Sequence, residues 1–577
     1  MASTRKRPVP FDRTTMLDAL RSSALDGGEP FDVLVVGGGI TGAGVALDAA
    51  NRGLRTALIE RDDFASGTSS KSSKLVHGGL RYLQNGDVRL VYEALHERRR
   101  LMRNAPHMVE VLPFLLPIMT KDGVISRKIA KALGSALWMY DLTGGWRIGK
   151  LHKRVSAEQA AKHFPSTHLE KLSGGFLYYD ATADDARLTL TIARTAATRG
   201  AVVANRCRLV ELRHIDGRVT GAAVEADGRR FDVATRSVVN ASGVWADDVR
   251  ALDEGRHPDS IRPAKGVHIT LPWSLVRNDI AVIIPVRRDK RSLFLVPWGA
   301  VEDGTFRHVY AGTTDTDFDG SMDEPQATAD DIDYILEALN QSLDTRPVGE
   351  AAADAGGHRP VTHADITGVW AGLRPLVKSA EGETGATKDL SRRHHIRSSE
   401  SGVVTVTGGK LTTYREMAAD AVDAAVALLP RGTAKRRSTK RLRLIGADAG
   451  AVPSDADPLT RHLARRFGSD ADEIRALVAF DATLGEPLVA GLPYLRAEAV
   501  YAVRHEMATS VEDVLLRRTR AHLLDRAASL VASPAVAELL ASELGWDRAT
   551  TEGQLEHYRA LCAAEEIAGE HVTNAAH

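Results

Sequence analysis

A short basic loop, residues 67–83, gathers many groups that could do chemistry. It reads GTSSKSSKLVHGGLRYL and contains four serines, a threonine and no acidic residue. Its positive or titratable groups are Lys71, Lys74, His77 and Arg81. Hydroxyl and ammonium groups donate hydrogen bonds to oxygen, and cations offset negative charge. The composition therefore favours a loop that lies against a polar, anionic ligand, and the alternative is a solvated basic loop.

A glycine motif precedes this loop. Gly37, Gly39 and Gly42 form G-x-G-x-x-G directly after the apolar run of residues 32–36, and a helical pattern follows. In such a motif the glycines allow a tight turn, a close approach of backbone to a pyrophosphate, and helix–strand packing. Glu60 ends the next predicted strand, where a carboxylate can bind ribose hydroxyls. The complete βαβ pattern predicts a dinucleotide site, and a glycine-rich turn without a ligand is the alternative.

Two later segments favour FAD over NAD as the dinucleotide. The apolar run VVNA leads into Ser242 and Gly243, which could bring a second stretch of backbone close to a cofactor. Residues 408–417, GGKLTTYREM, form a Gly-Gly turn that opens a helix and carries Lys410. A helix N-terminus with a lysine suits the part of a flavin where negative charge gathers on reduction. An ordinary strand end and an ordinary helix cap are the alternatives.

The elements that must position these groups predict an α/β fold. Short β-branched runs and alanine-rich helices indicate a Rossmann-like domain, into which strands of antiparallel character are inserted. The last part is rich in Ala, Arg and Leu at helical spacing. The predicted regions are a flexible N-terminal tail over 1–30, a cofactor domain over 31–430 with a sheet insert over roughly 106–175 and 265–374, and a helical C-terminal domain over 431–577.

Composition narrows the class of protein. The 577 residues are 44% hydrophobic with a formal net charge of zero, which predicts large cores and argues against nucleic-acid binding. Cys207 and Cys562 are the only cysteines and neither lies in a His/Cys cluster, so we expect no disulfide framework and no metal site. We find no secretory signal and no apolar run of about 18 residues, so any membrane contact is expected to be peripheral.

The motifs together resemble the FAD-dependent (respiratory, aerobic-type) glycerol-3-phosphate dehydrogenases. The resemblance rests on the basic loop, on VVGGGITGAGVALDAANRG, KGVH, GLRPLV and GGKLTTYRE, and on AVRHEMATSVEDVLLRRTR in the helical region. It covers nearly the whole chain after residue 30. It implies a Rossmann-like FAD domain interleaved with an antiparallel substrate sheet, of the glucose-oxidase and amino-acid-oxidase type, with an all-helical C-terminal domain.

The resemblance also implies site residues. The basic loop would lie along noncovalently held FAD, and its end, Arg81 with Tyr82, would face the substrate. The predicted FAD contacts are Gly37, Gly39, Gly42, Glu60, Thr68, Ser69, Ser70, Ser73, Lys74, His77, Gly78, Ser242, Gly243, Gly409, Lys410, Leu411 and Thr412.

The implied reaction is oxidation of sn-glycerol 3-phosphate to dihydroxyacetone phosphate, with hydride transfer to flavin N5 and electrons passed to a membrane quinone. Arginine's planar fork fits phosphate, so Arg374 and Arg81 are the predicted phosphate ligands. His268 is the predicted base, since an imidazole accepts a proton near neutrality. Lys410 is expected at substrate or flavin. The alternatives are an oxidase that makes hydrogen peroxide, an amine oxidase of related architecture, and a non-catalytic flavin-binding module.

Transfer to a quinone implies contact with a bilayer. We predict a cytoplasmic protein held peripherally on the inner face of the cell membrane, with a homodimer as one possible state. Residues 124–142 suggest the docking segment, because Ile125, Ile129, Leu133 and Leu137 recur at helical spacing beside basic residues. The alternative is an amphipathic helix that packs on its own domain.

Overall fold

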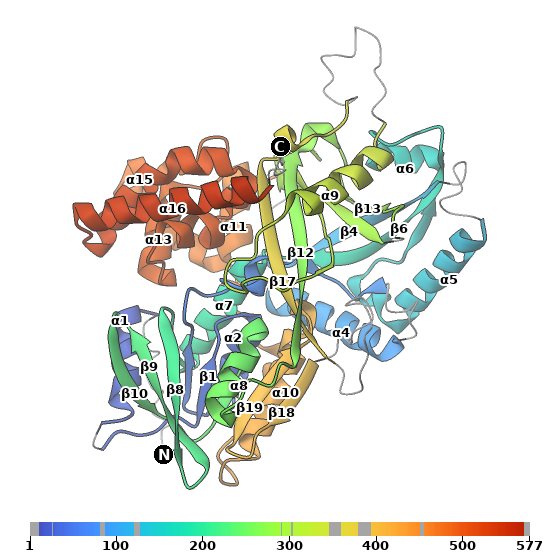
Figure 1. Cartoon of the computed structure of the whole chain (residues 1–577). Helices are drawn as coiled ribbons and strands as arrows, with labels where there is room; N and C mark the ends of the chain where they lie inside the picture. Colours follow the sequence, from blue (N-terminus) through green and yellow to red (C-terminus); the bar gives the residue numbers. More distant parts are fainter. Residues whose placement is uncertain are drawn as a thin grey trace, which may run out of the picture.

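The computed structural model describes three regions that meet around two long central strands (Figure 1). The described residues are 11–25, 27–80, 87–119, 127–289, 291–301, 304–344, 359–378, 394–449 and 455–569.

A six-stranded sheet forms the first region, in the order β18-β19-β11-β1-β2-β7. Its strands pair in parallel except for β18, which runs antiparallel to β19. The central strands are short apolar runs because both faces of the sheet are buried. The strands are β1 (Val33–Val36), β2 (Thr56–Ile59), β7 (Val202–Ala204), β11 (Val238–Asn240), β18 (His394–Ser398) and β19 (Val403–Gly408).

Helices cover this sheet, and a small second sheet belongs to the same region. Helix α2 packs between α7 and α10, and the antiparallel strands β8, β9 and β10 form a separate three-stranded sheet. The elements are α2 (Ile40–Asn51), α7 (Asp185–Thr198), α8 (Ala246–Glu254), α10 (Tyr414–Val426), β8 (Cys207–Ile215), β9 (Arg218–Ala226) and β10 (Arg229–Ala234).

The N-terminal segment differs from the prediction of a flexible tail over residues 1–30. Residues Arg13–Ser22 form helix α1, and the side chain of Asp12 accepts a hydrogen bond from Thr15 N to cap it. Met16, Leu17 and Leu20 lie on one face and are buried against the first region. Burial of the three apolar side chains and the N-terminal cap stabilise a packed helix relative to a flexible tail. Residues 1–10 lie outside the described part of the chain.

A ten-stranded mixed sheet forms the second region. Its main path runs β16-β12-β15-β14-β13-β4-β6-β3, with β17 paired to β12 and β5 to β6. The strands are β3 (Leu75–Val76), β4 (Glu110–Met119), β5 (Lys153–Val155), β6 (Leu172–Thr182), β12 (Ile261–Pro272), β13 (Ala281–Pro285), β14 (Ser292–Ala300), β15 (Phe306–Gly312), β16 (Thr316–Asp317) and β17 (Gly368–Val377). Its helices are α4 (Val88–Asn104), α5 (Arg127–Thr143), α6 (Ala157–His163) and α9 (Ala329–Ser342).

Strands β12 and β17 matter most for the site. They pair antiparallel from Ile261 opposite Val377 to Thr270 opposite Gly368, and they cross the centre of the molecule (Figure 1). This pairing brings the segment around residue 268 and the segment around residue 374 to adjacent strands, although about a hundred residues separate them in the sequence.

The C-terminal region is helical and lies beside the other two (Figure 1). Among the described helices, α15 alone has the length and apolar composition of a membrane-spanning helix (mean hydropathy 1.3), yet it packs between α13 and α16. The elements are α11 (Pro458–Phe467), α12 (Ala471–Phe480), α13 (Arg496–Glu506), a π-helical turn (Asp513–Arg518), α14 (Ala521–Leu524), α15 (Arg526–Leu544) and α16 (Arg548–Gly569).

Helix α5 is the segment in which we predicted a membrane-docking stripe. It is helical, but the prediction of an outward-facing stripe fails at Leu137, which is fully buried, and at Leu133, which packs against the same core cluster. Tyr140 on this face donates hydrogen bonds to the buried carboxylate of Asp180. The regular apolar spacing therefore marks the face that packs on the protein. Ile125 lies outside the described residues.

Candidate functional site

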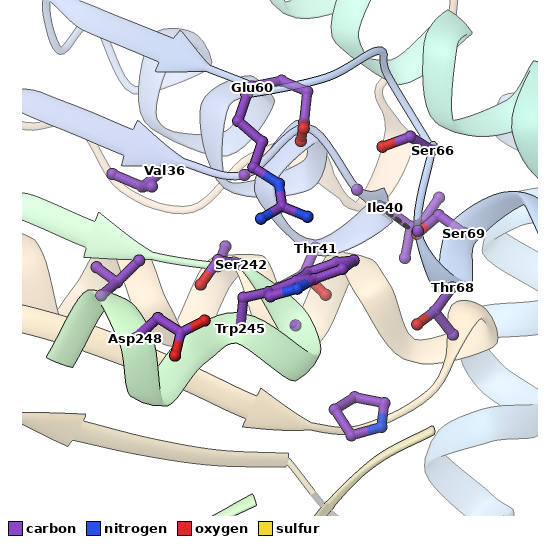
Figure 2. Close-up of a pocket in the computed structure, with 18 of the residues that line it drawn as sticks. Val36, Ile40, Thr41, Glu60, Ser66, Thr68, Ser69, Ser242, Trp245 and Asp248 are labelled. Atoms are coloured by element: carbon purple, nitrogen blue, oxygen red, sulfur yellow. Dashed lines mark hydrogen bonds between the residues drawn. The ribbon is translucent and has the colours of Figure 1, made fainter. Parts of the chain in front are cut away.

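An elongated cavity of about 420 Å³ lies at the carboxyl ends of β1 and β2, where helix α2 begins. Figure 2 shows Glu60 and Ser66 on one side of it and Ser242, Trp245 and Asp248 on the other. Ligands of open α/β sheets bind at such an edge, and the helix N-terminus offers free N–H groups to phosphate oxygens.

The first and third glycines of the motif stand where the backbone leaves no room for a side chain. Gly37 has a φ of +110°, and a Cβ there would lie 2.7 Å from the carbonyl oxygen of Ala241. A Cβ at Gly42 would overlap the carbonyl oxygen of Gly37, so this glycine sets the packing of α2 on β1. Gly37 and Gly39 line the cavity, and Gly42 lies behind them.

Glu60 ends β2 at the cavity wall. Its carboxylate accepts hydrogen bonds from Gly38 N at 2.6 Å and from Asp62 N at 2.8 Å. Burial raises the pKa of Glu60 to about 7, and the two backbone N–H groups oppose that rise. A fixed, poorly solvated carboxylate of this kind is suited to accept hydrogen bonds from ribose hydroxyls.

The start of the basic loop closes one side of the cavity. Ile40 is the first residue of α2, and its backbone N–H donates a hydrogen bond to Ser69 Oγ at 2.9 Å. Thr68 Oγ1 donates to the carbonyl oxygen of Leu373 on β17 at 2.6 Å. The loop therefore connects the helix N-terminus to the strand pair of the second sheet.

A second cavity, of about 210 Å³, continues from the first along the basic loop. Both cavities are lined by Thr68, Pro375, Gly408, Gly409, Lys410 and Leu411. Of the other predicted FAD contacts, Ser73, His77 and Thr412 line the second cavity, and Ser242 and Gly243 line the first.

His268 projects from β12 into the wall of the second cavity. Only 2% of the residue is exposed, and its ring stacks on Trp370 at 4.8 Å between centroids. Nε2 lies 2.8 Å from Ser73 Oγ, and Nδ1 has no hydrogen-bond partner among the described residues. Burial, then the charges of Lys74 and Arg374, hold the pKa of His268 well below its usual value. The ring is therefore neutral near pH 7, as a general base must be.

Arg374 lies on the adjacent strand β17 and lines the same cavity. Its guanidinium pairs with Asp315 at 3.1 Å and donates to Thr313 Oγ1 at 3.1 Å and to the carbonyl oxygen of Thr314 at 3.1 Å. The side chain keeps 22% of its area exposed. These bonds hold the planar group in place on the cavity wall, and a guanidinium held in this way suits recognition of an anion.

The turn at residues 408–413 completes the second cavity. Lys410 lies on this turn, which precedes helix α10. Thr412 Oγ1 accepts a hydrogen bond from His77 N at 3.2 Å and donates to His77 O at 3.3 Å, so the turn and the basic loop hold each other.

Several predicted contacts lie elsewhere. Ser70, Lys74 and Gly78 are not on the walls of the two cavities. Ser70 and Lys74 point behind the loop, where the ammonium of Lys74 lies 3.5 Å from Asp185 and 4.4 Å from the centre of the Trp370 ring. A Cβ at Gly78 would lie 2.5 Å from Tyr140 Oη, so this glycine allows close packing. A loop has two faces, and its composition does not say which face a side chain takes.

Arg81 and Tyr82, the predicted substrate contacts at the end of the basic loop, lie outside the described residues.

Sequence reasoning missed some lining residues of the first cavity. Trp245 contributes its ring, with the guanidinium of Arg61 stacked at 4.5 Å from the ring centre. Asp248 and the segment 207–210 also line this cavity. Arg61 directly follows Glu60, and Trp245 lies two residues after Gly243. Their position in the sequence, next to predicted FAD contacts, was therefore the signal that could have identified Arg61 and Trp245.

The two joined cavities can hold an extended dinucleotide and a small anion. The first supplies a helix N-terminus, a carboxylate and backbone at close approach. The second supplies the neutral imidazole of His268, the guanidinium of Arg374 and two lysines, Lys71 and Lys410, around a space for a small molecule. Such an arrangement suits removal of a proton and a hydride from a small anionic alcohol.

Comparison with known families agrees with this geometry. Residues 32–415 match the family described as "FAD dependent oxidoreductase". Residues 437–551 match the "C-terminal domain of alpha-glycerophosphate oxidase".

Individual relatives extend the similarity over nearly the whole chain. Glycerol-3-phosphate dehydrogenase 2 of Mycobacterium tuberculosis (strain H37Rv) is 41% identical, covering 93% of this chain and 89% of its own. The mitochondrial glycerol-3-phosphate dehydrogenase of Homo sapiens is 36% identical over 92% of this chain and 72% of its own. The solved structure of glycerol-3-phosphate dehydrogenase from Bacillus halodurans complexed with FAD has a TM-score of 0.72 at 28% identity, covering 97% of this chain and 98% of its own.

Proposed function

The chain belongs to the family of FAD-dependent glycerol-3-phosphate dehydrogenases, and from this premise we propose that it oxidises sn-glycerol 3-phosphate to dihydroxyacetone phosphate and passes the electrons to a membrane quinone. One observation carries the proposal most directly. Strands β12 and β17 bring His268 and Arg374 to one small cavity that opens into the dinucleotide site.

The chain binds FAD, and its residues fit that cofactor. The adenosine and pyrophosphate parts suit the first cavity, with Glu60 at the ribose and the N-terminus of α2 at the phosphates. The turn at 408–412 suits the pyrimidine end of the flavin. When bound, FAD supplies N5 as the acceptor of the hydride that leaves C2 of the substrate.

The protein's own residues bind the substrate and move its proton. Arg374 binds the phosphate, and Lys410 adds positive charge beside the substrate or the flavin. His268 takes the proton of the C2 hydroxyl, while Ser73 and Trp370 hold its ring in position.

A decisive test uses the bound flavin as the reporter. Purified protein is mixed with sn-glycerol 3-phosphate under nitrogen, and the flavin absorbance is followed. We expect rapid bleaching, no bleaching with glycerol at equal concentration, and formation of dihydroxyacetone phosphate. Unchanged absorbance would reject the proposed activity and leave a flavin-binding module.

The oxygen-dependent oxidase is the second candidate, because residues 437–551 match a domain named for alpha-glycerophosphate oxidase. We favour the quinone acceptor because the relatives that match nearly the whole chain are named dehydrogenases. Turnover under air with measurement of hydrogen peroxide, compared with turnover on a short-chain quinone, separates the two. We expect the quinone to be reduced faster than oxygen.

The FAD should be bound without a covalent link, because no histidine or cysteine stands in a recognisable linkage motif. Acid precipitation is expected to release the yellow colour into the supernatant, where it is identified as FAD. Colour that stays with the pellet would contradict noncovalent binding.

We further propose that a surface formed by α4, α5 and residues 145–151 docks on the bilayer. Its exposed apolar side chains are Val88, Tyr92, Trp138, Met139, Leu142, Trp146 and Leu151. On α5, Trp138 is 56% exposed and Leu142 is 73% exposed, whereas Leu137 is fully buried. Arg147 lies over the ring of Trp146. Aromatic rings and apolar side chains beside basic residues suit the headgroup region of an anionic bilayer.

Substitutions on this exposed surface test membrane docking better than substitutions of Leu133 and Leu137, which pack in the core. The double variant Trp138→Glu, Leu142→Glu should bind anionic vesicles at least roughly 10-fold more weakly, because each apolar side chain contributes about 1.5 kcal/mol or more on burial. Turnover with a soluble dye should stay unchanged. Val531→Glu is the control, since Val531 is 83% exposed but lies on the C-terminal domain. Parent-like sedimentation of the double variant would place the docking surface elsewhere.

A further inference from the structure

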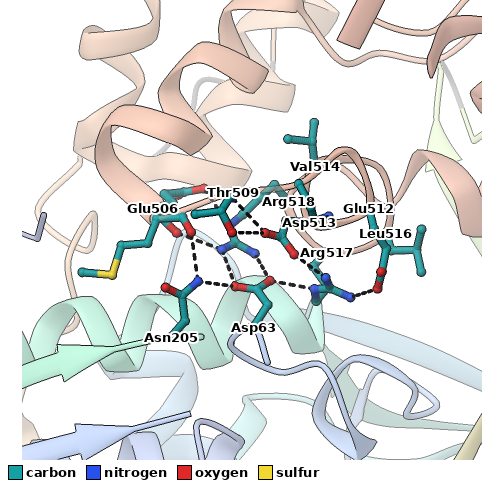
Figure 3. A network of polar contacts seen from close by, with 12 residues as sticks. Asp63, Asn205, Glu506, Thr509, Glu512, Asp513, Val514, Leu516, Arg517 and Arg518 are labelled. Atoms are coloured by element: carbon teal, nitrogen blue, oxygen red, sulfur yellow. Dashed lines mark hydrogen bonds and ion pairs between the residues drawn. The ribbon is translucent and has the colours of Figure 1, made fainter. Parts of the chain in front are cut away.

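The C-terminal domain contacts the chain just before the basic loop at one place and the loop itself at another. Figure 3 shows Asp63, just before the loop, between Arg517 and Arg518 of the π-helical turn. Arg517 Nε donates to Asp63 at 2.6 Å, and Arg518 donates to both of its carboxylate oxygens at 2.7 and 2.8 Å. Asp63 is fully buried, and these guanidinium groups hold its pKa far below the usual range against the opposing effect of burial.

The second contact is made by Arg520. Its guanidinium donates a hydrogen bond to the carbonyl oxygen of Ser70 and pairs with Asp185 at 2.9 Å. Only 1% of the residue is exposed. Its backbone is in the left-handed region, with a φ of +70°, which non-glycine residues seldom adopt. Such a conformation persists where the surrounding contacts fix it, and it often accompanies a functional constraint.

Asp185 links Arg520 to the basic loop. Its carboxylate accepts hydrogen bonds from Ser72 N at 2.9 Å and from Ser72 Oγ at 2.7 Å. The same carboxylate lies 3.5 Å from the ammonium of Lys74. Ser73 lies between Ser72 and Lys74 in the sequence, and its hydroxyl oxygen is 2.8 Å from Nε2 of His268.

We propose that Arg520 is a positioning residue for catalysis: through Asp185 and the carbonyl of Ser70 it fixes the basic loop, and so fixes Ser73 against His268. The helical C-terminal domain thereby acts on the reaction, although Arg520 lies outside both cavities. The inference rests on the proposed function for its catalytic consequence, while the effect on loop order does not depend on it.

The test compares variants of two interdomain arginines, Arg520 with 1% and Arg194 with 12% of the side chain exposed. Arg520→Met removes the contact to the loop. Arg194→Met is the matched control, since Arg194 on α7 also reaches the C-terminal domain, where it donates to Asp470 at 3.0 Å and to Tyr501 Oη at 2.9 Å. Both should lower the melting temperature, because each removes a partner from a buried charge.

Only Arg520→Met should affect the loop. In the FAD-loaded protein without substrate, we expect faster hydrogen–deuterium exchange over residues 67–77 than in the parent or in Arg194→Met. The rate constant of flavin reduction should fall by about 10- to 100-fold, with a smaller change in the substrate concentration at half-saturation, as expected for a misplaced catalytic group. If Arg520→Met does not fold, Arg520→Lys replaces it, because it keeps the charge but loses the two-armed guanidinium.

Exchange and reduction rates that match Arg194→Met or the parent would overturn the proposal. If the parent itself is not reduced by sn-glycerol 3-phosphate, the proposed function fails, and the exchange measurement still decides whether Arg520 orders the loop.

Discussion

Replacement of His268 by alanine is expected to slow flavin reduction by about 100- to 10,000-fold, the usual contribution of a general base. The C2 hydroxyl must lose its proton as the hydride leaves, and His268 is the neutral imidazole on the cavity wall. The measurement is single-turnover reduction under nitrogen, with binding of dihydroxyacetone phosphate followed separately. Binding of this product should change much less.

The pH profile gives an independent check on the same residue. Burial holds the pKa of His268 well below its ordinary value, so the base stays neutral at a lower pH than a solvent-exposed histidine would. The reduction rate should therefore remain level down to a pH below about 6.5 and fall as the pH drops through the lowered pKa. In His268→Ala this acid limb should disappear.

His308→Ala is the matched control for the variant. His308 lies on the neighbouring strand β15, is also buried, and has its pKa lowered to about 4 by burial, but it does not line the cavity. It should lose stability and keep its reduction rate. A rate for His268→Ala within a few-fold of the parent would remove His268 from the role of base and move attention to Lys410.

Replacement of Arg374 by alanine should lower kcat/KM for sn-glycerol 3-phosphate by roughly 10- to 100-fold. A hydrogen bond to a charged group contributes about 1.5–3 kcal/mol, and the guanidinium is already oriented by Asp315 and Thr313 before a phosphate arrives. Steady-state kinetics with a soluble dye measures the effect. Glycerol, which has no phosphate, should be an equally poor substrate for the parent and the variant.

A second arginine variant separates phosphate binding from a general loss of charge. Arg262 lies on β12 and pairs with Asp317 at 2.6 Å, but it does not line the cavity. Arg262→Ala should keep the parent's kcat/KM. If Arg374→Ala also keeps it, while melting shows both proteins to be folded, the phosphate site does not include Arg374.

The sequence alone established the cofactor domain. A glycine motif has strict steric requirements at each position, and the βαβ pattern around it fixes where a pyrophosphate and a ribose can bind. Gly37, Gly39 and Glu60 all line the first cavity. The same local logic located the turn at 408–412, because a Gly-Gly pair before a helical pattern is a short-range signal.

Tertiary structure decided which residues of distant segments meet. His268 and Arg374 are far apart in the chain, and only the antiparallel register of β12 and β17 brings them to one cavity. The choice of His268 among 20 histidines depended on family resemblance, since the residue type alone does not say which histidine lies in the cavity.

The direction of side chains was the least predictable property. The regular spacing of Leu133 and Leu137 marks an apolar face, but spacing does not state whether that face meets a bilayer or the protein's own core. Lys74 belongs to a loop of the right composition and points behind it to Asp185. Local sequence determines what an element is and which residues share a face. Only the packing of the other elements around it determines what that face touches, because burial and charge pairing depend on neighbours distant in the chain.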